Sequence, residues 1–114
     1  MHFLFGYEQQ KQIAYQLSLV LKAVISQRLL PRADGKGRIA AFEIMFVNSA
    51  ISNLIRENKT ANINQAIQTG MFDGMMTIEK SMSDLLKTNL ITKEAVMEYC
   101  GDTAKMVKYL SREI

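Results

Sequence analysis

The sequence has few of the residues from which metal and nucleophilic centres are usually built. Its 114 residues include one cysteine, Cys100, and one histidine, His2. A single cysteine excludes an internal disulfide and a thiolate cage for a metal ion, and it is typical of a reducing compartment. His2 has no cysteine or carboxylate cluster beside it, and Cys100 has no nearby imidazole, because the one histidine lies at the other end of the sequence. We therefore predict no metal site and no catalytic residue, with Cys100 buried and unreactive and His2 solvated.

Long hydrophobic runs and phosphate-binding motifs are also absent. No apolar stretch reaches the roughly 18 residues that cross a bilayer, and the first residues lack the basic and apolar regions of a signal peptide. The sequence contains no G-x-x-x-x-G-K-[ST] motif, with which a P-loop holds nucleotide phosphates. "DGKGR" at 34–38 has glycines and cations, but this composition is typical of a turn. We therefore expect that the chain alone is not an enzyme and has no cofactor-binding residues.

The net charge of +3 is unevenly distributed along the chain. Five basic residues and one acidic residue lie between Lys22 and Arg38, a local charge of +4, so the remaining residues sum to −1. Such a patch can face phosphate, an acidic partner surface or water, and it is much smaller than the basic stripe of most nucleic-acid-binding proteins. A nucleic-acid binder that uses Lys36 and Arg38 is the least favoured of our hypotheses, and we expect no nucleic-acid partner.

The apolar pattern predicts helices that are interrupted by one hairpin. Residues 8–27 carry apolar side chains at helical spacing without a breaker, which predicts a helix of about five turns. The turn-rich "ADGKG" between two apolar runs predicts a β-hairpin over 28–47, with a loop of three to five residues in which Gly35 and Gly37 supply positive φ. Pro31 removes a ladder hydrogen bond, so we expect it at a strand end or at a sheet edge.

Residues 48–114 predict a helical subdomain. Asn48 and Thr92 are candidates for helix N-caps, and Asn89 is placed where a left-handed residue ends a helix. The chain as a whole, residues 1–114, is therefore predicted to be a single α+β domain, mostly α, with five or six helices and one β-hairpin. An isolated two-stranded hairpin is marginally stable, which favours the edge of a larger sheet whose other strands lie outside this sequence.

The stretch "AISNLIREN", residues 50–58, has more polar chemistry than a packing helix requires. An apolar stripe at i, i+1, i+4 and i+5 is formed by Ala50, Ile51, Leu54 and Ile55. The opposite flank carries Asn53, Arg56 and Glu57. On the residues alone, such a flank is more often a solvated surface than a binding surface.

Several segments together resemble the C-terminal part of the type IV pilus retraction ATPases, the hexameric motors of twitching motility. In order they are "EQQKQI", "LKAVISQRLLPRADGKGRIAAFEIM", "AISNLIREN", "INQAIQTG", "GMMTIEKSMSDLL" and "LITKEAV". These motors carry a hallmark usually written AIRNLIRE, and "AISNLIRE" at 50–57 matches it at every position but one. The resemblance implies a retraction or interaction motif, rather than a site of ATP hydrolysis, at Ala50, Ile51, Asn53, Leu54, Ile55, Arg56 and Glu57.

The sequence departs from the family pattern at several points. Ser52 stands where the family usually has arginine, and because serine cannot replace the donor fork of a guanidinium, a partner contact there is expected to be weakened or altered. "FGYEQQ" lacks the proline pair usual before the glutamines, and Ala14 stands where a basic residue is common. The tetracysteine zinc element of the related assembly and type II secretion ATPases is absent, which favours the retraction branch.

The resemblance implies the edge of a P-loop ATPase C-terminal domain, because the phosphate-binding loop, the acidic strand and the histidine segment of the full-length motors all precede the matched part. ATP and magnesium would then be handled elsewhere in a full-length protein. The implied function is a force-transmitting or interaction segment of the motor, and the implied partners are the other subunits of the hexamer and the inner-membrane platform protein of the pilus. We expect a cytoplasmic location at the inner face of the inner membrane, with membrane association only through partners. The alternative is a free-standing interaction module that binds and modulates the motor or its platform.

Overall fold

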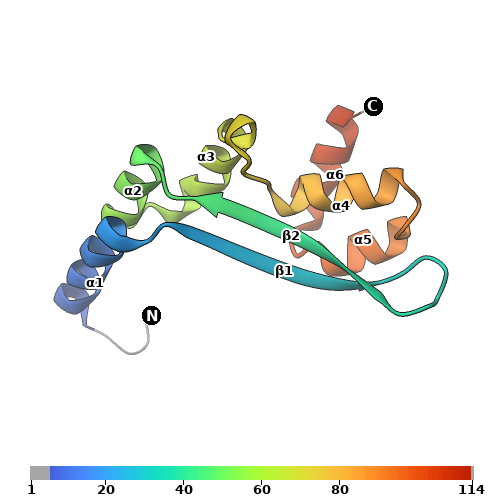
Figure 1. The fold of residues 1–114 in the computed structure, drawn as a ribbon, viewed down its shortest axis with the longest axis horizontal. Helices are drawn as coiled ribbons and strands as arrows, with labels where there is room; N and C mark the ends of the chain where they lie inside the picture. Colours follow the sequence, from blue (N-terminus) through green and yellow to red (C-terminus); the bar gives the residue numbers. More distant parts are fainter. Residues whose placement is uncertain (1–5, 114) are drawn as a thin grey trace. The chain divides into compact units, whose positions relative to one another are not determined.

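The structure is a computed structural model and describes residues 6–113, so that His2 lies outside the described residues. Residues in this range form six α-helices and one β-hairpin, which are labelled in Figure 1. The elements are α1 (Tyr7–Val20), β1 (Ala23–Pro31), β2 (Arg38–Phe46), α2 (Ser49–Arg56), α3 (Ile63–Thr69), α4 (Ile78–Lys87), α5 (Lys93–Tyr99) and α6 (Thr103–Glu113). Short 3-10 turns, Thr60–Asn62 and Met71–Asp73, lie on either side of α3. The predicted fold class, α+β and mostly helical, is confirmed.

The first helix is shorter than the sequence predicted, and the hairpin starts earlier. α1 ends at Val20 rather than at residue 27, and residues 23–27 form the start of β1. The apolar spacing of this stretch fits a helix, but the β-branched Val24 and Ile25 favour a strand. Each strand has nine residues. Their pairing satisfies backbone groups of β2 as well as of β1, whereas a longer helix would satisfy only its own.

The hairpin loop is longer than predicted. Six residues, 32–37, separate the two strands, and the carboxylate of Asp34 supports the wider loop by accepting hydrogen bonds from the Arg32 side chain and the Lys36 backbone. Gly35 and Gly37 have φ values of +74° and +91°, as predicted. The expectation that Pro31 ends its strand is also confirmed.

The predicted helix ends are confirmed at three positions. The Asn48 side chain accepts a hydrogen bond from a backbone N–H in the first turn of α2 at 2.9 Å. Thr92 does the same for α5 at 3.1 Å. Asn89 has a φ of +61° directly after α4. These ends were predictable because each depends on a few consecutive residues.

The chain groups into two compact units, a division that the sequence did not predict. The first unit contains residues up to Val24 together with Ile44–Met75, and the second contains Ile25–Glu43 and the residues from Met76 onward. The helices predicted to form one subdomain over 48–114 therefore fall into both units, with α2 and α3 in the first and α4 to α6 in the second.

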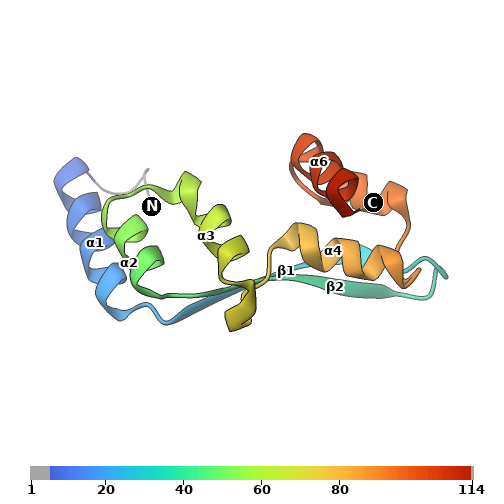
Figure 2. The ribbon, with the colours of Figure 1, turned by 90° about the horizontal axis from the view of Figure 1, so that it is seen from above.

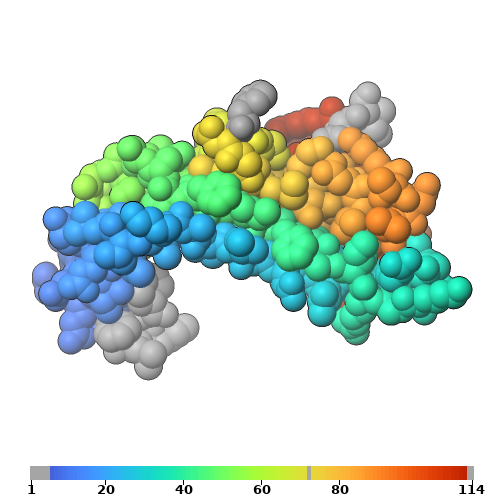
Figure 3. All heavy atoms as spheres, viewed as in Figure 1, coloured from blue at the N-terminus to red at the C-terminus, as the bar shows by residue number. Residues whose placement is uncertain are grey.

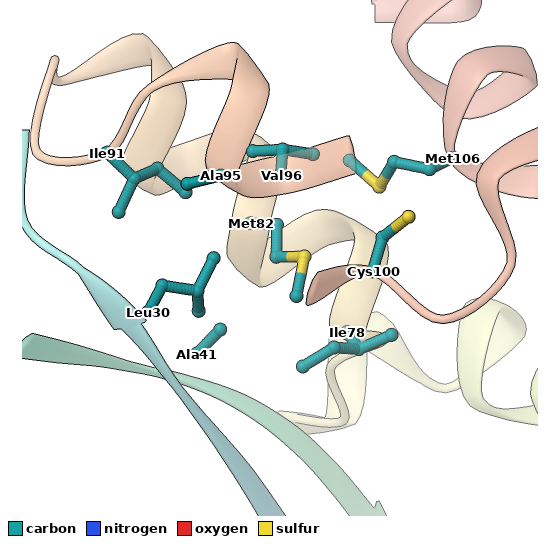
Figure 4. Close-up of a cluster of buried hydrophobic side chains, with 9 residues drawn as sticks. All are labelled: Leu30, Ala41, Ile78, Met82, Ile91, Ala95, Val96, Cys100 and Met106. Carbon is teal, nitrogen blue, oxygen red and sulfur yellow. The ribbon is translucent and has the colours of Figure 1, made fainter. Parts of the chain in front are cut away.

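The second unit is built around a cluster of buried side chains from the hairpin and from the last three helices. Figure 4 shows these side chains pointing toward one another: Leu30, Ala41, Ile78, Met82, Ile91, Ala95, Val96, Cys100 and Met106. Cys100 is 5% exposed, which confirms its predicted burial. In the view of Figure 2, α4 runs along the hairpin, and a hydrogen bond of 2.9 Å from the Phe42 backbone N–H to Ser81 Oγ joins the two.

The first unit has a smaller core. It consists of Met45, Ile51, Ile67 and Met75. Helices α1 and α2 lie side by side in both ribbon views (Figures 1 and 2), with Ala14 and Ser18 as the buried residues of α1. This pair of helices carries the motif that the sequence singled out.

Candidate functional site

The hallmark-like stretch forms helix α2, and one of its residues anchors the helix in the core. Ile51 is fully buried, while Leu54 and Ile55 are half-buried. Ala50, which was expected in the apolar stripe, is exposed instead. Its methyl group has little area to bury, so this exposure costs little free energy. The stripe is therefore narrower than predicted.

The polar flank of α2 is exposed, as expected of either a solvated or a binding surface. Asn53, Arg56 and Glu57 all face solvent. Arg56 Nη2 donates a hydrogen bond to Asn53 Oδ1, and Glu57 Oε2 pairs with Lys59 Nζ at 3.2 Å. Since a guanidinium has five N–H donors, the bond to Asn53 leaves most of the hydrogen-bonding capacity of Arg56 for another partner.

Ser52, the position that departs from the hallmark, contacts α1. Its Oγ donates a hydrogen bond of 2.7 Å to the backbone carbonyl of Ser18, and its side chain is half-buried. The sequence had predicted an altered partner contact at this position and did not predict a bond within the chain. No sequence signal indicated this bond, because the two residues are far apart in the chain and become neighbours only when the helices pack.

A cleft of about 140 Å³ lies beside the polar flank, between the first half of α1 and the end of α2. Its lining includes Tyr7, Lys11 and Ala14 from α1 and Arg56, Glu57 and Asn58 from the end of α2. The structure therefore brings two of the predicted site residues, Arg56 and Glu57, together with residues of α1 that the sequence had not singled out. Lys11 lies in "EQQKQI", one of the family-like segments, and this was the one sequence signal that pointed to the α1 side of the cleft.

The hairpin of the second unit exposes apolar side chains. Ile25 is 65% exposed, Leu29 is 45% exposed and Phe42 is 38% exposed. In the space-filling view of Figure 3, the blue atoms of β1 lie at the surface. The sheet has two strands among the described residues, so the outer edge of β1 has no partner strand there. Exposed apolar side chains beside an open strand edge are typical of a surface that binds another chain segment.

Metal-binding clusters and membrane-spanning helices are both absent from residues 6–113. The described residues contain no group of three or more His, Cys, Asp or Glu side chains that could hold a metal ion. No helix in the same range is both long and apolar enough to cross a membrane.

Comparison with known proteins identifies relatives of the chain. No protein-family model matches it. It is 42% identical over 98 residues to the twitching motility protein of Neisseria gonorrhoeae, a match that covers 86% of this chain and 26% of that protein. It is 43% identical over 94 residues to the type IV pilus retraction ATPase PilT of Pseudomonas aeruginosa, which covers 82% of this chain and 27% of PilT. The type IV pilus ATPase PilU of the same organism is 30% identical over 110 residues, covering 94% of this chain and 28% of PilU.

Solved structures agree with these matches. The pilus retraction motor PilT with bound ADP superposes with a TM-score of 0.70 and 41% identity, covering 84% of this chain and 26% of the motor. The ATPase DotB of Legionella pneumophila, with a TM-score of 0.59 and 14% identity over 80% of this chain and 24% of DotB, shares the fold. The chain spans about a quarter of the length of the curated relatives that it matches. Over that span, it is a relative of the type IV pilus retraction ATPases.

Proposed function

We propose that this chain is the C-terminal, force-transmitting and interaction segment of a type IV pilus retraction ATPase, and that α2 carries its working surface. The observation that supports this most is that the hallmark-like helix α2 is buried on one face and exposed on the other. Ile51 is fully buried and holds the helix in the core, while Asn53, Arg56 and Glu57 face solvent. A polar surface on a firmly anchored helix can pass subunit motion to a partner without folding or unfolding itself.

The hairpin supports a role within a larger motor. Ile25 and Leu29 are exposed beside an open strand edge, and the relatives are about four times as long as the matched segment. In this proposal the remainder of the motor binds ATP and magnesium, the other subunits of the hexamer and the inner-membrane platform of the pilus are the partners, and the segment works at the cytoplasmic face of the inner membrane.

The experiment that tests the proposal replaces Arg56 by alanine. A chimera carries this chain in place of the corresponding quarter of P. aeruginosa PilT, and both ATP hydrolysis and twitching are measured. Because Arg56 is exposed and makes one hydrogen bond to Asn53, we expect Arg56→Ala to change the free energy of unfolding by no more than about 0.5 kcal/mol. We also expect it to abolish retraction while ATP hydrolysis continues.

The matched control is Arg112→Ala, which removes an exposed arginine from the last turn of α6, and it should retract normally. Normal retraction by Arg56→Ala would overturn the role of α2 as the working surface. A loss of several kcal/mol in stability would show that Arg56 is structural.

The second candidate is a free-standing module that binds and modulates the motor or its platform. The observation that favours it is the presence of a buried core in each compact unit, since such cores support folding of the chain alone. The module hypothesis predicts binding to a full motor at micromolar concentration. A calorimetric titration without heat, together with no co-elution, would count against it.

A further inference from the structure

The cleft beside the hallmark-like helix has the size of a side-chain site rather than of a small-molecule site. Its volume is about 140 Å³, below the roughly 300 Å³ at which pockets for drug-sized ligands begin. Ala14, 5% exposed, gives it an apolar wall. The cleft can therefore hold one side chain of a partner, with an apolar stem against Ala14 and a polar head toward the residues at its rim.

Two cations line the cleft from different helices, and neither forms an ion pair with another residue in 6–113. Lys11 on α1 has its Nζ 5.3 Å from the centre of the Tyr7 ring, a cation–π contact that favours this position of the ammonium group. Arg56, at the end of α2, donates one hydrogen bond within residues 6–113, to Asn53 Oδ1. Both side chains thus keep donors for an incoming acceptor.

The acidic residue of the cleft lining is already engaged. Glu57 is the one acidic residue of the lining, and its Oε2 pairs with Lys59 Nζ at 3.2 Å. The carbonyl groups at the C-terminal end of a helix carry partial negative charge, which repels anions. At the end of α2, three of these carbonyls accept backbone hydrogen bonds from the N–H groups of Glu57, Asn58 and Lys59, and this weakens the repulsion. The lining therefore has two cations, Lys11 and Arg56, against one anion, Glu57, which leaves it attractive to negative charge.

We propose that this cleft receives a glutamate or aspartate side chain from an acidic segment of a partner protein. Arg56 and Lys11 would donate to the carboxylate from two sides, and an arginine fork matches a carboxylate in geometry as well as in charge. The inference rests on the proposed function, because it gives the working surface on α2 a partner of stated chemistry.

The test uses the full 114-residue chain, labelled with nitrogen-15, and a hexaglutamate peptide as the probe. Backbone amide signals are followed by NMR at constant ionic strength during the titration. We expect the largest changes at Lys11, Arg56 and Asn58. Arg56→Gln and Lys11→Gln should each weaken binding by about two- to fivefold, which is the range for one exposed ion pair.

Two further variants sharpen the test. Glu57→Gln removes the negative charge from the lining and should tighten hexaglutamate binding. Lys93→Gln makes the same charge change as Lys11→Gln at an exposed position on α5, and it should leave the affinity unchanged. An equal response to sodium sulfate, changes spread over all lysines, or unchanged affinity in both Arg56→Gln and Lys11→Gln would overturn the proposal.

The outcome is separable from that of the retraction assay. Loss of retraction in Arg56→Ala without hexaglutamate binding would overturn the carboxylate site and leave α2 as the working surface. Hexaglutamate binding with normal retraction in Arg56→Ala would overturn the role of α2 as the working surface and leave the chain with a carboxylate site.

Discussion

The hydroxyl of Ser52 satisfies a backbone group that the end of α1 leaves without an intrahelical partner. The last four carbonyl groups of an α-helix have no donor within the helix, and α1 ends at Val20. The carbonyl of Ser18 belongs to this group and accepts the Ser52 hydrogen bond at 2.7 Å. Position 52 therefore joins two helices here, where the family usually has an arginine that could reach a partner.

At the scale of this residue, we predict that Ser52→Ala lowers the free energy of unfolding by about 1 kcal/mol, the usual net contribution of one hydrogen bond. The measurement is urea-induced unfolding. Ser49→Ala, at an exposed position in the first turn of the same helix, is the control and should change stability by less than about 0.5 kcal/mol. Equal effects of the two substitutions would contradict the prediction.

Among the elements, those whose signals are local were predicted best. Asn48 and Thr92 cap their helices as expected because a cap depends on the next few residues. The boundary between α1 and β1 was predicted wrongly, because residues 23–27 suit either structure and their choice depends on β2, which follows only after the loop. Within the segment itself, the β-branched Val24 and Ile25 favour a strand, but the helical apolar spacing opposes this signal.

The hairpin loop carries a charge arrangement whose pH dependence can be measured. The hydrogen bond from the Arg32 side chain, followed by that from the Lys36 backbone, lowers the pKa of Asp34 below its ordinary value. Because the pKa is lower in the folded state, the stabilisation is present above the unfolded-state value of about 3.9. It is lost as the pH falls through the folded-state pKa.

We therefore expect an NMR titration of the Asp34 carboxyl carbon to give a midpoint below that of an unperturbed aspartate. Arg32→Gln should raise this midpoint, because it removes the largest cause of the shift. Lys87→Gln, a change of the same charge outside the loop, is the control and should leave the midpoint of Asp34 where it is. A midpoint that does not move in Arg32→Gln would show that the arginine is not responsible.

For the whole molecule, the order of several short segments predicted the family, and the comparisons confirmed it. The cleft was not predictable in the same way. Lys11 and Arg56 lie on different helices, and their approach depends on how α1 packs against α2. A motif identifies the residues on its own helix, whereas the residues that complete a site come from elsewhere in the chain and become visible only in the folded structure.

For the whole molecule, we also predict that the isolated chain hydrolyses no ATP. Phosphoryl transfer depends on a phosphate cradle and a bound magnesium ion, and the sequence contains no G-x-x-x-x-G-K-[ST] motif. Phosphate release by the purified chain should equal that of the buffer, while the chimera with PilT should be active under the same conditions. If release exceeds the buffer value, Lys36→Ala tests the glycine-rich "DGKGR" loop as its source. Activity that this substitution abolishes would contradict the prediction, because it would place a phosphate site within the hairpin itself.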